Sequence, residues 1–296
     1  IFTADKLESY GEANYLKGGI VYADAVTTVS ETYAYEITTE QGGEGLDGLL
    51  RVRKNDLYGI LNGLDYGEYD PQNDPYIYNH FNESSFQDGK KLNKSKLQKE
   101  LGLPVKENAM LIGIVSRMTS QKGFDLVAYI MDELLATEDV QIVVLGTGED
   151  RYQDMLRYFA QKYPEKLYAN IGYSEEMAHR IYASCDAFLM PSLFEPCGLS
   201  QLMSLRYGTV PIVRETGGLK DTVEAYNEYE HTGTGFSFAN YNAHEMLGTI
   251  RYALSVFNDH KKEWNGLIQR GMKQDFSWKR SAGKYEALYE KLTDFQ

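Results

Sequence analysis

Two cations that are five residues apart are the side chains best placed to do chemistry in this chain. Arg117 and Lys122 lie in the segment Ser116–Gly123, which follows the apolar run Met110–Val115 and precedes a helical pattern beginning at Phe124. Strand ends in open parallel sheets line the ligand crevice, and helix N-termini offer free N–H groups and partial positive charge. The pattern therefore predicts a diphosphate site, and pairing with surface carboxylates is the alternative interpretation.

A second segment combines a carboxylate with a glycine at the start of a predicted helix. Pro191–Leu199 follows an apolar run of strand length and contains Glu195. The N–H groups that we expect at the helix start belong to Cys197, Gly198 and Leu199. A carboxylate that accepts and N–H groups that donate can together bind a polyhydroxylated ring. The alternative is that Glu195 only caps the helix.

Weaker candidates also follow apolar runs of strand length. The residues Thr216, Gly217 and Gly218 precede a predicted helix, Tyr173 could stack on a flat base, and Asn62 would face an interdomain cleft. Each has an ordinary structural alternative: a plain glycine turn, a packed tyrosine and an Asn-Gly turn, respectively.

Signatures of metal sites and of other catalytic classes are missing from the sequence. The five histidines are scattered without an i,i+4 or Cys-x-x-Cys partner, so we expect no zinc site. Neither a Gly-x-Ser-x-Gly elbow nor a phosphate-binding Walker loop occurs. We therefore predict a protein that uses no metal and no cofactor.

The composition limits the partners and the compartment. The chain has 296 residues, is 43% hydrophobic and 25% charged, and carries a net charge of −13. Such a charge repels nucleic acid and anionic membranes, so phosphate binding has to be local, and we expect neither as a partner. Two cysteines, no visible signal peptide and no apolar run near the length that spans a bilayer predict a cytoplasmic protein. A homo-oligomer stays open.

The order of the elements predicts an α/β fold with a doubly wound parallel sheet. Continuous apolar strands that alternate with amphipathic helices are typical of a parallel sheet covered on both faces. The predicted strands are Met110–Val115, Val140–Leu145, Leu167–Ile171, Ala187–Met190 and Val210–Val213. Residues 1 to about 65 predict half of a second α/β unit, and Asp65 to Lys94 reads as a linker or wrapping loop.

These segments, taken together, resemble the bacterial glycogen synthases and the related starch synthases. The resemblance runs in order along nearly the whole chain. It rests on Thr28–Ile37, Ile60–Asp65, Val115–Gly123, Pro191–Leu199, Tyr207–Arg214, Thr216–Val223 and Asp275–Trp278. It implies a retaining glycosyltransferase of the GT-B type, with two Rossmann-like lobes. Such an enzyme transfers glucose from ADP-glucose to the non-reducing end of an α-1,4-glucan without a metal.

The resemblance also assigns roles. It implies that Arg117 and Lys122 stabilise the charge on departing ADP, and that Glu195 and the Cys197–Leu199 backbone hold the glucosyl hydroxyls. It places Tyr173 on adenine and Asn62 near the glucose. The residues Thr216, Gly217 and Gly218 are counted with the substrate-binding residues.

The resemblance divides the chain and shows a departure from the family pattern. It implies a partial N-terminal lobe (1–75), a complete C-terminal nucleotide-sugar lobe (76–277) and a last helix crossing back (278–296). The family's Lys-x-Gly-Gly-Leu loop and glucose-contacting histidine have no counterpart here, so we expect a chain that binds nucleotide better than it turns over. The alternatives are a retaining transferase with a UDP-glucose donor or a sucrose-type acceptor, and a non-catalytic module that binds nucleotide or glucan.

Overall fold

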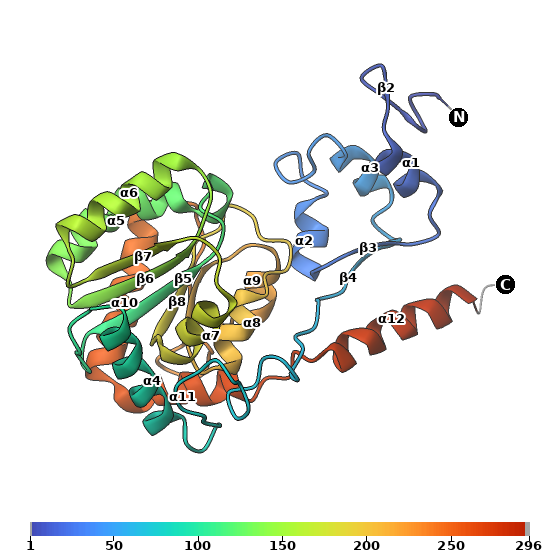
Figure 1. Cartoon of the computed structure of the whole chain (residues 1–296). Coiled ribbons are helices and arrows are strands. Elements are labelled where there is room, and N and C mark those ends of the chain that lie inside the picture. Colours follow the sequence, from blue (N-terminus) through green and yellow to red (C-terminus); the bar gives the residue numbers. More distant parts are fainter. Residues whose placement is uncertain (1, 294–296) are drawn as a thin grey trace.

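A computed structural model describes residues 2–293 of the chain. Figure 1 shows a large α/β body, a smaller N-terminal unit and a long terminal helix. Residue 1 and residues 294–296, which the predicted first and last divisions of the chain include, lie outside the described part.

The body is built on a six-stranded sheet whose strands are all parallel. Its strands are β5 (Met110–Val115), β6 (Val140–Gly146), β7 (Leu167–Ile171), β8 (Ala187–Met190), β9 (Val210–Arg214) and β10 (Phe236–Phe238). They lie in the order β10-β9-β8-β5-β6-β7, so the direction of winding reverses between β5 and β8. This is the doubly wound topology that the sequence predicts, and the prediction is confirmed. The sixth strand was missed because its three residues are too short to show a pattern.

Helices cover both faces of this sheet, as continuous apolar strands require. One group packs together through α5 (Phe124–Thr137), α6 (Asp150–Lys162) and α10 (Ala243–Asp259). The other group contains α4 (Phe86–Glu100), α7 (Glu175–Ser184), α8 (Ser200–Arg206), the short α9 (Gly217–Thr222) and α11 (Lys261–Met272). The core between these layers is built from fully buried side chains of β5, β6 and β8.

The N-terminal unit contains an antiparallel pair of strands, β1 and β2, and a parallel pair, β3 and β4, with short helices around them. Its elements are β1 (Glu8–Ser9), β2 (Glu12–Ala13), α1 (Tyr15–Tyr22), β3 (Val26–Thr28), α2 (Glu31–Glu36), α3 (Asp47–Val52) and β4 (Leu57–Gly59). Asn14 and Ser30 begin α1 and α2, because each side chain accepts a backbone N–H of the first turn. The sequence predicted half of a second α/β unit in residues 1 to about 65, and the alternation of α1, β3, α2 and β4 agrees with this prediction.

Two chain segments run side by side between this unit and the body. The Leu64 N–H donates to Phe276 O at 2.7 Å, and the Tyr66 hydroxyl accepts the Phe276 N–H at 2.8 Å. The terminal helix α12 (Trp278–Thr293) then runs back beside the N-terminal unit, where Lys291 Nζ donates to the Tyr58 hydroxyl at 3.0 Å. These paired segments connect the unit to the body, and α12 runs back from the body beside the unit (Figure 1).

No helix within residues 2–293 is long and apolar enough to cross a lipid bilayer.

The predicted linker, Asp65 to Lys94, is wrong at its C-terminal end, because α4 begins at Phe86. The sequence hides this helix because its buried face is largely polar. The buried polar side chains are Lys90, Asn93, Lys94 and Gln98. The helix is therefore stabilised by buried hydrogen bonds rather than by an apolar stripe.

Lys90 shows how the buried face of α4 is satisfied. Its Nζ donates to Ala183 O at 3.2 Å, to Tyr207 O at 3.1 Å and to Thr209 Oγ1 at 2.8 Å, so all three protons have acceptors. Burial lowers the pKa of Lys90 to about 8, although the Asp186 charge opposes this change. The ammonium group thus links α4 to the ends of α7 and α8 at a cost in desolvation.

We expect the stability of the wild type, relative to Lys90→Met, to rise between pH 7.5 and 9.5. The folded state loses its Lys90 proton near pH 8, whereas the unfolded state keeps it until about pH 10.5. The unfolded state binds more protons in this interval, so the free energy of unfolding rises with pH, by about 2 kcal/mol. Urea unfolding of both proteins at the two pH values measures the difference. Lys96→Met, an exposed position on the same helix, is the control. A pH-independent difference between wild type and Lys90→Met would contradict the prediction.

Candidate active site

Two loops meet where the winding of the sheet reverses. One loop follows β5 and covers residues 116–123, and the other follows β8 and covers residues 191–199. The Leu193 N–H donates to Gln121 O at 2.8 Å, and Gln121 Nε2 donates to Phe194 O at 3.4 Å. A reversal point of this kind opens a crevice at the carboxyl ends of the strands, where ligands bind in open α/β sheets.

An ion pair joins the two loops across this crevice. Lys122 Nζ lies 2.6 Å from Glu195 Oε2, and the two side chains are 17% and 8% exposed. The Ser192 hydroxyl donates to the same oxygen at 3.0 Å, so that Glu195 is fixed from two sides. Both charged residues line one pocket together with Ser116 and Gly198. The predicted catalytic residues Lys122 and Glu195 are therefore brought together.

Arg117 lies on the same loop but remains exposed. Its Nη2 donates to Gln121 Oε1 at 3.3 Å, which uses one of its five N–H donors. The loop thus presents two cations in a chain whose net charge is −13. An anion that enters the crevice meets a fixed ammonium group and a more mobile guanidinium group, which suits a diphosphate.

The Gly-Gly pair that begins α9 packs against the backbone of the Glu195 loop. The Gly218 N–H donates to Glu195 O at 3.0 Å. A Cβ on Gly217 would lie 1.9 Å from Glu195 O, and one on Gly218 would lie 1.9 Å from Cys197 O. Only glycine permits this approach. The predicted substrate-binding residues Gly217 and Gly218 thus position the backbone that carries Glu195.

The first turn of α9 also meets the N-terminal unit. Glu36 of α2 accepts hydrogen bonds from the Thr216 hydroxyl and the Gly217 N–H, both at 3.0 Å. In return, Asp221 of α9 accepts the Thr32 N–H at 3.0 Å and also the Thr32 hydroxyl. Each short helix therefore offers a carboxylate to the start of the other. The donors of Thr216 and Gly217 are directed at Glu36.

The other predicted residues of the Glu195 loop are held by one buried side chain. Gly198 has a φ of +69°, and a Cβ there would lie 2.3 Å from Gln201 Oε1. Gln201 Nε2 donates to Cys197 O at 2.9 Å and to Gly198 O at 3.0 Å. Leu199 is exposed beside them and also lines the pocket of the ion pair. The conformation of this loop therefore depends on Gln201.

Asn62 reaches the same loop from the N-terminal unit. Burial raises the pKa of the Cys197 thiol, and a hydrogen bond with the Asn62 backbone opposes that change. The predicted positions Asn62 and Cys197 are therefore in contact across the two units, next to Glu195.

Tyr173 has a different position. It follows β7, is 85% exposed, and donates its hydroxyl to Glu175 at the start of α7. This hydrogen bond and the Glu175 charge raise the pKa of the Tyr173 phenol. The ring is on the surface and accessible, so its face is available for stacking.

Sequence reasoning missed several residues that shape the site. Ser192 and Gln121 lie inside the two predicted loop segments. Their polar side chains, close in sequence to Glu195 and Lys122, could have indicated that they take part in the site. Glu36 lies 181 residues before Gly217, and a single sequence gives no signal for that contact.

Gly123 sets how closely the two loops approach. Its φ is +79°, and a Cβ at this position would lie 2.2 Å from Pro191 O. Both the left-handed backbone and the contact with Pro191 therefore require glycine. The residue also follows Lys122 directly, so any shift here moves the ion pair.

Comparison with known families and proteins gives a consistent result. The family model for glycosyl transferases group 1 matches residues 93–264, and that for the starch synthase catalytic domain matches residues 1–52. The chain is 67% identical over 291 residues to a glycogen synthase of Lachnospira eligens and 62% identical over 291 residues to one of Lachnoclostridium phytofermentans. Each alignment covers 98% of this chain and 61% of the relative, so the chain spans about three fifths of these relatives.

A solved structure shows the same arrangement of elements. The catalytic domain of starch synthase IV from Arabidopsis thaliana, bound to ADP and acarbose, superposes with a TM-score of 0.90 at 34% identity. The match covers 98% of this chain and 60% of that one. The GT-B fold class predicted from the sequence is confirmed.

We expect Gly123→Ala to lower the free energy of unfolding by at least about 2 kcal/mol, because alanine disfavours the left-handed backbone and would collide with Pro191. Gly248→Ala is the matched control, since this glycine lies inside α10 and a Cβ there meets nothing within 4 Å. The control should gain about 0.5–1 kcal/mol from helix propensity. Urea unfolding of both variants measures the effects. If Gly123→Ala and Gly248→Ala had equal free energies of unfolding, the two loops would not need this close approach.

Proposed function

Because this chain belongs to the glycosyl transferases of group 1, we propose that it carries the nucleotide-sugar side of a glycogen synthase. The reaction is the transfer of glucose from ADP-glucose to the non-reducing end of an α-1,4-glucan, with retention of configuration. The observation that carries the proposal is the Lys122–Glu195 pair, 2.6 Å apart at the winding reversal of the sheet. The similarity to glycogen synthases over 98% of the chain supports it.

Lys122 and Arg117 supply positive charge where the reaction needs it. Negative charge builds on the diphosphate as the bond to glucose breaks, and preorganised cations beside it lower the barrier. Lys122 is already fixed by Glu195, so little reorganisation is needed when the diphosphate arrives. We propose that these two side chains take the part that a divalent ion plays in other transferases, so that the transfer needs no metal or other cofactor.

Glu195 has a second task, which is to hold the sugar. Its carboxylate can accept from glucosyl hydroxyls while the adjacent N–H groups of Cys197, Gly198 and Leu199 donate to them. Asn62, whose backbone contacts Cys197, approaches the same sugar from the N-terminal unit, and this contact supports the assignment. The proposed partners are therefore ADP-glucose or ADP on the large body and an α-1,4-glucan between the two units.

Two further assignments belong to the same proposal. Tyr173 stacks on the adenine with its exposed ring, and Thr216, Gly217 and Gly218 serve substrate binding through the Glu195 loop that α9 supports. The similar starch synthase structure holds ADP and acarbose, which supports a nucleotide and a saccharide in this fold.

We expect calorimetric titration in a metal-free buffer to show that ADP binds and that UDP binds more weakly. Arg117→Ala and Lys122→Ala should each weaken ADP binding by about 10- to 100-fold, because each removes a charged hydrogen-bond donor. Lys99→Ala, which removes a charge from an exposed position of α4, is the control and should bind ADP like the wild type.

The outcomes of this titration are distinct. Unchanged ADP affinity in both variants would contradict the diphosphate site. A preference for UDP would keep the site and replace the proposed donor by another sugar nucleotide. Binding of neither nucleotide to a folded wild-type chain would contradict the proposal as a whole.

Glu195→Gln should separate the sugar from the diphosphate. We expect ADP to bind at least as tightly as to the wild type, because Lys122 remains and a carboxylate near the phosphates is gone. ADP-glucose should bind about 10-fold more weakly, since the amide is a poorer acceptor for hydroxyls. Competition titration with both ligands measures this, with the exposed Glu290→Gln as control. If Glu195 only capped α8, both ligands would be affected alike.

A further inference from the structure

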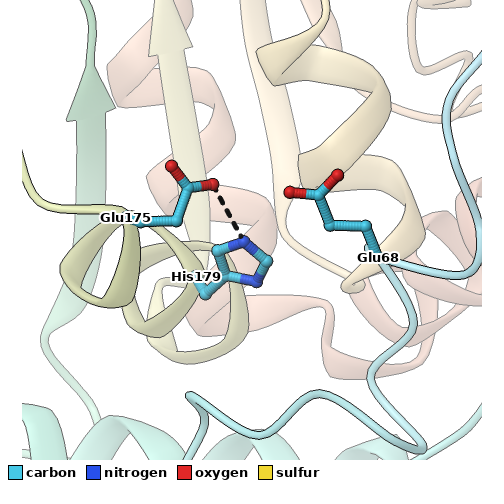
Figure 2. A group of neighbouring side chains, drawn as sticks. All are labelled: Glu68, Glu175 and His179. Atoms are coloured by element: carbon cyan, nitrogen blue, oxygen red, sulfur yellow. Dashed lines mark ion pairs between the residues drawn. The ribbon is translucent and has the colours of Figure 1, made fainter.

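A second polar cluster lies outside the crevice, beside the segment that follows β4. It consists of Glu68 from that segment and of Glu175 and His179 from α7 (Figure 2). One ligand atom from each residue lies within 4.8 Å of those from the other two. Figure 2 shows the imidazole between the two carboxylates, with one ring nitrogen directed toward the space between them.

The imidazole of His179 is rigidly oriented. The residue is 1% exposed, and its Nδ1 lies 2.7 Å from Oδ2 of the buried Asp74. The Tyr207 hydroxyl donates to the same Asp74 oxygen, and the Tyr69 ring stacks on the imidazole with centroids 4.8 Å apart. When the imidazole is neutral, a carboxylate at Nδ1 holds the proton there and leaves a lone pair on Nε2. This is the arrangement that orients metal-binding histidines.

The other nitrogen of this ring is unsatisfied. Within residues 2–293, the buried Nε2 of His179 has no hydrogen-bond partner. The ion-pair distance to Glu175 Oε1 is 3.4 Å, which is too long for a good hydrogen bond. Buried polar atoms are nearly always satisfied, and a lone pair that faces two carboxylates is repelled by them. Something positively charged is therefore needed between these groups.

The spacing of these atoms fits a small divalent ion. Zinc takes nitrogen at about 2.0–2.1 Å and carboxylate oxygen at about 2.0–2.2 Å in tetrahedral geometry, which places the two ligand atoms about 3.4 Å apart. Glu175 Oε1 and His179 Nε2 have this separation, 3.4 Å. The two residues are four positions apart on α7 and so share one face of the helix. A Glu-x-x-x-His spacing is neither a paired-histidine nor a Cys-x-x-Cys pattern, so the sequence alone did not indicate this pair.

We propose that Glu68, Glu175 and His179 bind a divalent metal ion of the zinc type, with a water molecule as the fourth ligand. The ion joins the segment after β4 to α7 and so fixes the connection between the N-terminal unit and the body. Asp74 acts as the positioning residue that holds the imidazole. The site is structural and is separate from the proposed transfer chemistry. It stands whether or not the transferase proposal holds, because none of its ligands belongs to the crevice.

A protonated His179 is the competing arrangement. Burial opposes protonation, but the Asp74 hydrogen bond and charge outweigh it and raise the pKa of His179, with a smaller contribution from Glu175. An imidazolium would then bridge Asp74 and Glu175 without any ion. The two arrangements differ in whether the chain binds zinc and in whether the exposed Glu68 matters.

The test is calorimetric titration of the chelator-stripped, tag-free chain with Zn²⁺ at pH 7.5. We expect one ion per chain and a thermal unfolding temperature that rises with Zn²⁺. Glu68→Gln and Glu175→Gln should each weaken binding by at least about 10-fold, since each removes a charged ligand. Glu68 is exposed, so its substitution does not threaten folding. Glu176→Gln, an exposed carboxylate next to Glu175 on α7, is the matched control and should bind like the wild type.

Three results would overturn the proposal. The first is the absence of Zn²⁺ binding, which would leave the protonated bridge. The second is equal binding by Glu68→Gln and by Glu176→Gln, which would place zinc elsewhere. The third is Mg²⁺ binding as tight as Zn²⁺ binding, because a site with a nitrogen ligand discriminates against magnesium.

Discussion

The close approach of the loops after β5 and β8 is the constraint on which the site depends. A doubly wound sheet separates these two loops by one strand spacing at its reversal point, and Gly123 lets their backbones touch at Pro191. That contact brings Lys122 to within 2.6 Å of Glu195. The pair keeps a cation fixed in a half-buried pocket and gives the carboxylate a partner that compensates its burial. A side chain at Gly123 would push the two loops apart and so separate Lys122 from Glu195.

Buried polar groups at the starts of β5 and β8 also help to hold these two strands together. Lys94 Nζ lies 2.7 Å from Asp186 Oδ2, and that same oxygen accepts the Leu111 N–H at 2.8 Å. Asp186 precedes β8 and Leu111 is the second residue of β5, so this network fixes the two strands whose opposite ends carry the site. Buried networks of this kind stabilise one arrangement because each member would be costly to leave unpaired.

The sequence predicts those elements whose residues form a local pattern, and it does not predict contacts between distant residues. Strands such as β5 and β8 were predicted to the residue because continuous apolar runs of this length have few other interpretations. Helix α4 was missed because Lys90 and Lys94 occupy its buried face, where periodicity analysis expects apolar residues. The crevice followed from strand ends and helix starts, since topology alone brings these together. The Glu36 contact with Gly217 did not, because nothing local encodes a hydrogen bond between residues so far apart in the chain.

The contacts between the N-terminal unit and the body favour a site that is assembled rather than preformed. Helices α2 and α9 exchange carboxylates: Glu36, the last residue of α2, accepts from the first turn of α9, and Asp221, near the end of α9, accepts from the first turn of α2. Both helices have six residues and would be marginal alone. Each therefore gains a hydrogen-bond acceptor for its first turn from the other, and α9 in turn supports the backbone of Glu195. A shift of the N-terminal unit would therefore move α9 through Glu36, and α9 would move Glu195 through the hydrogen bond from the Gly218 N–H to Glu195 O. The second polar cluster lies on the segment that makes this attachment. The geometry of the crevice is thus coupled to contacts outside it, through short helices whose stability depends on both units being in place.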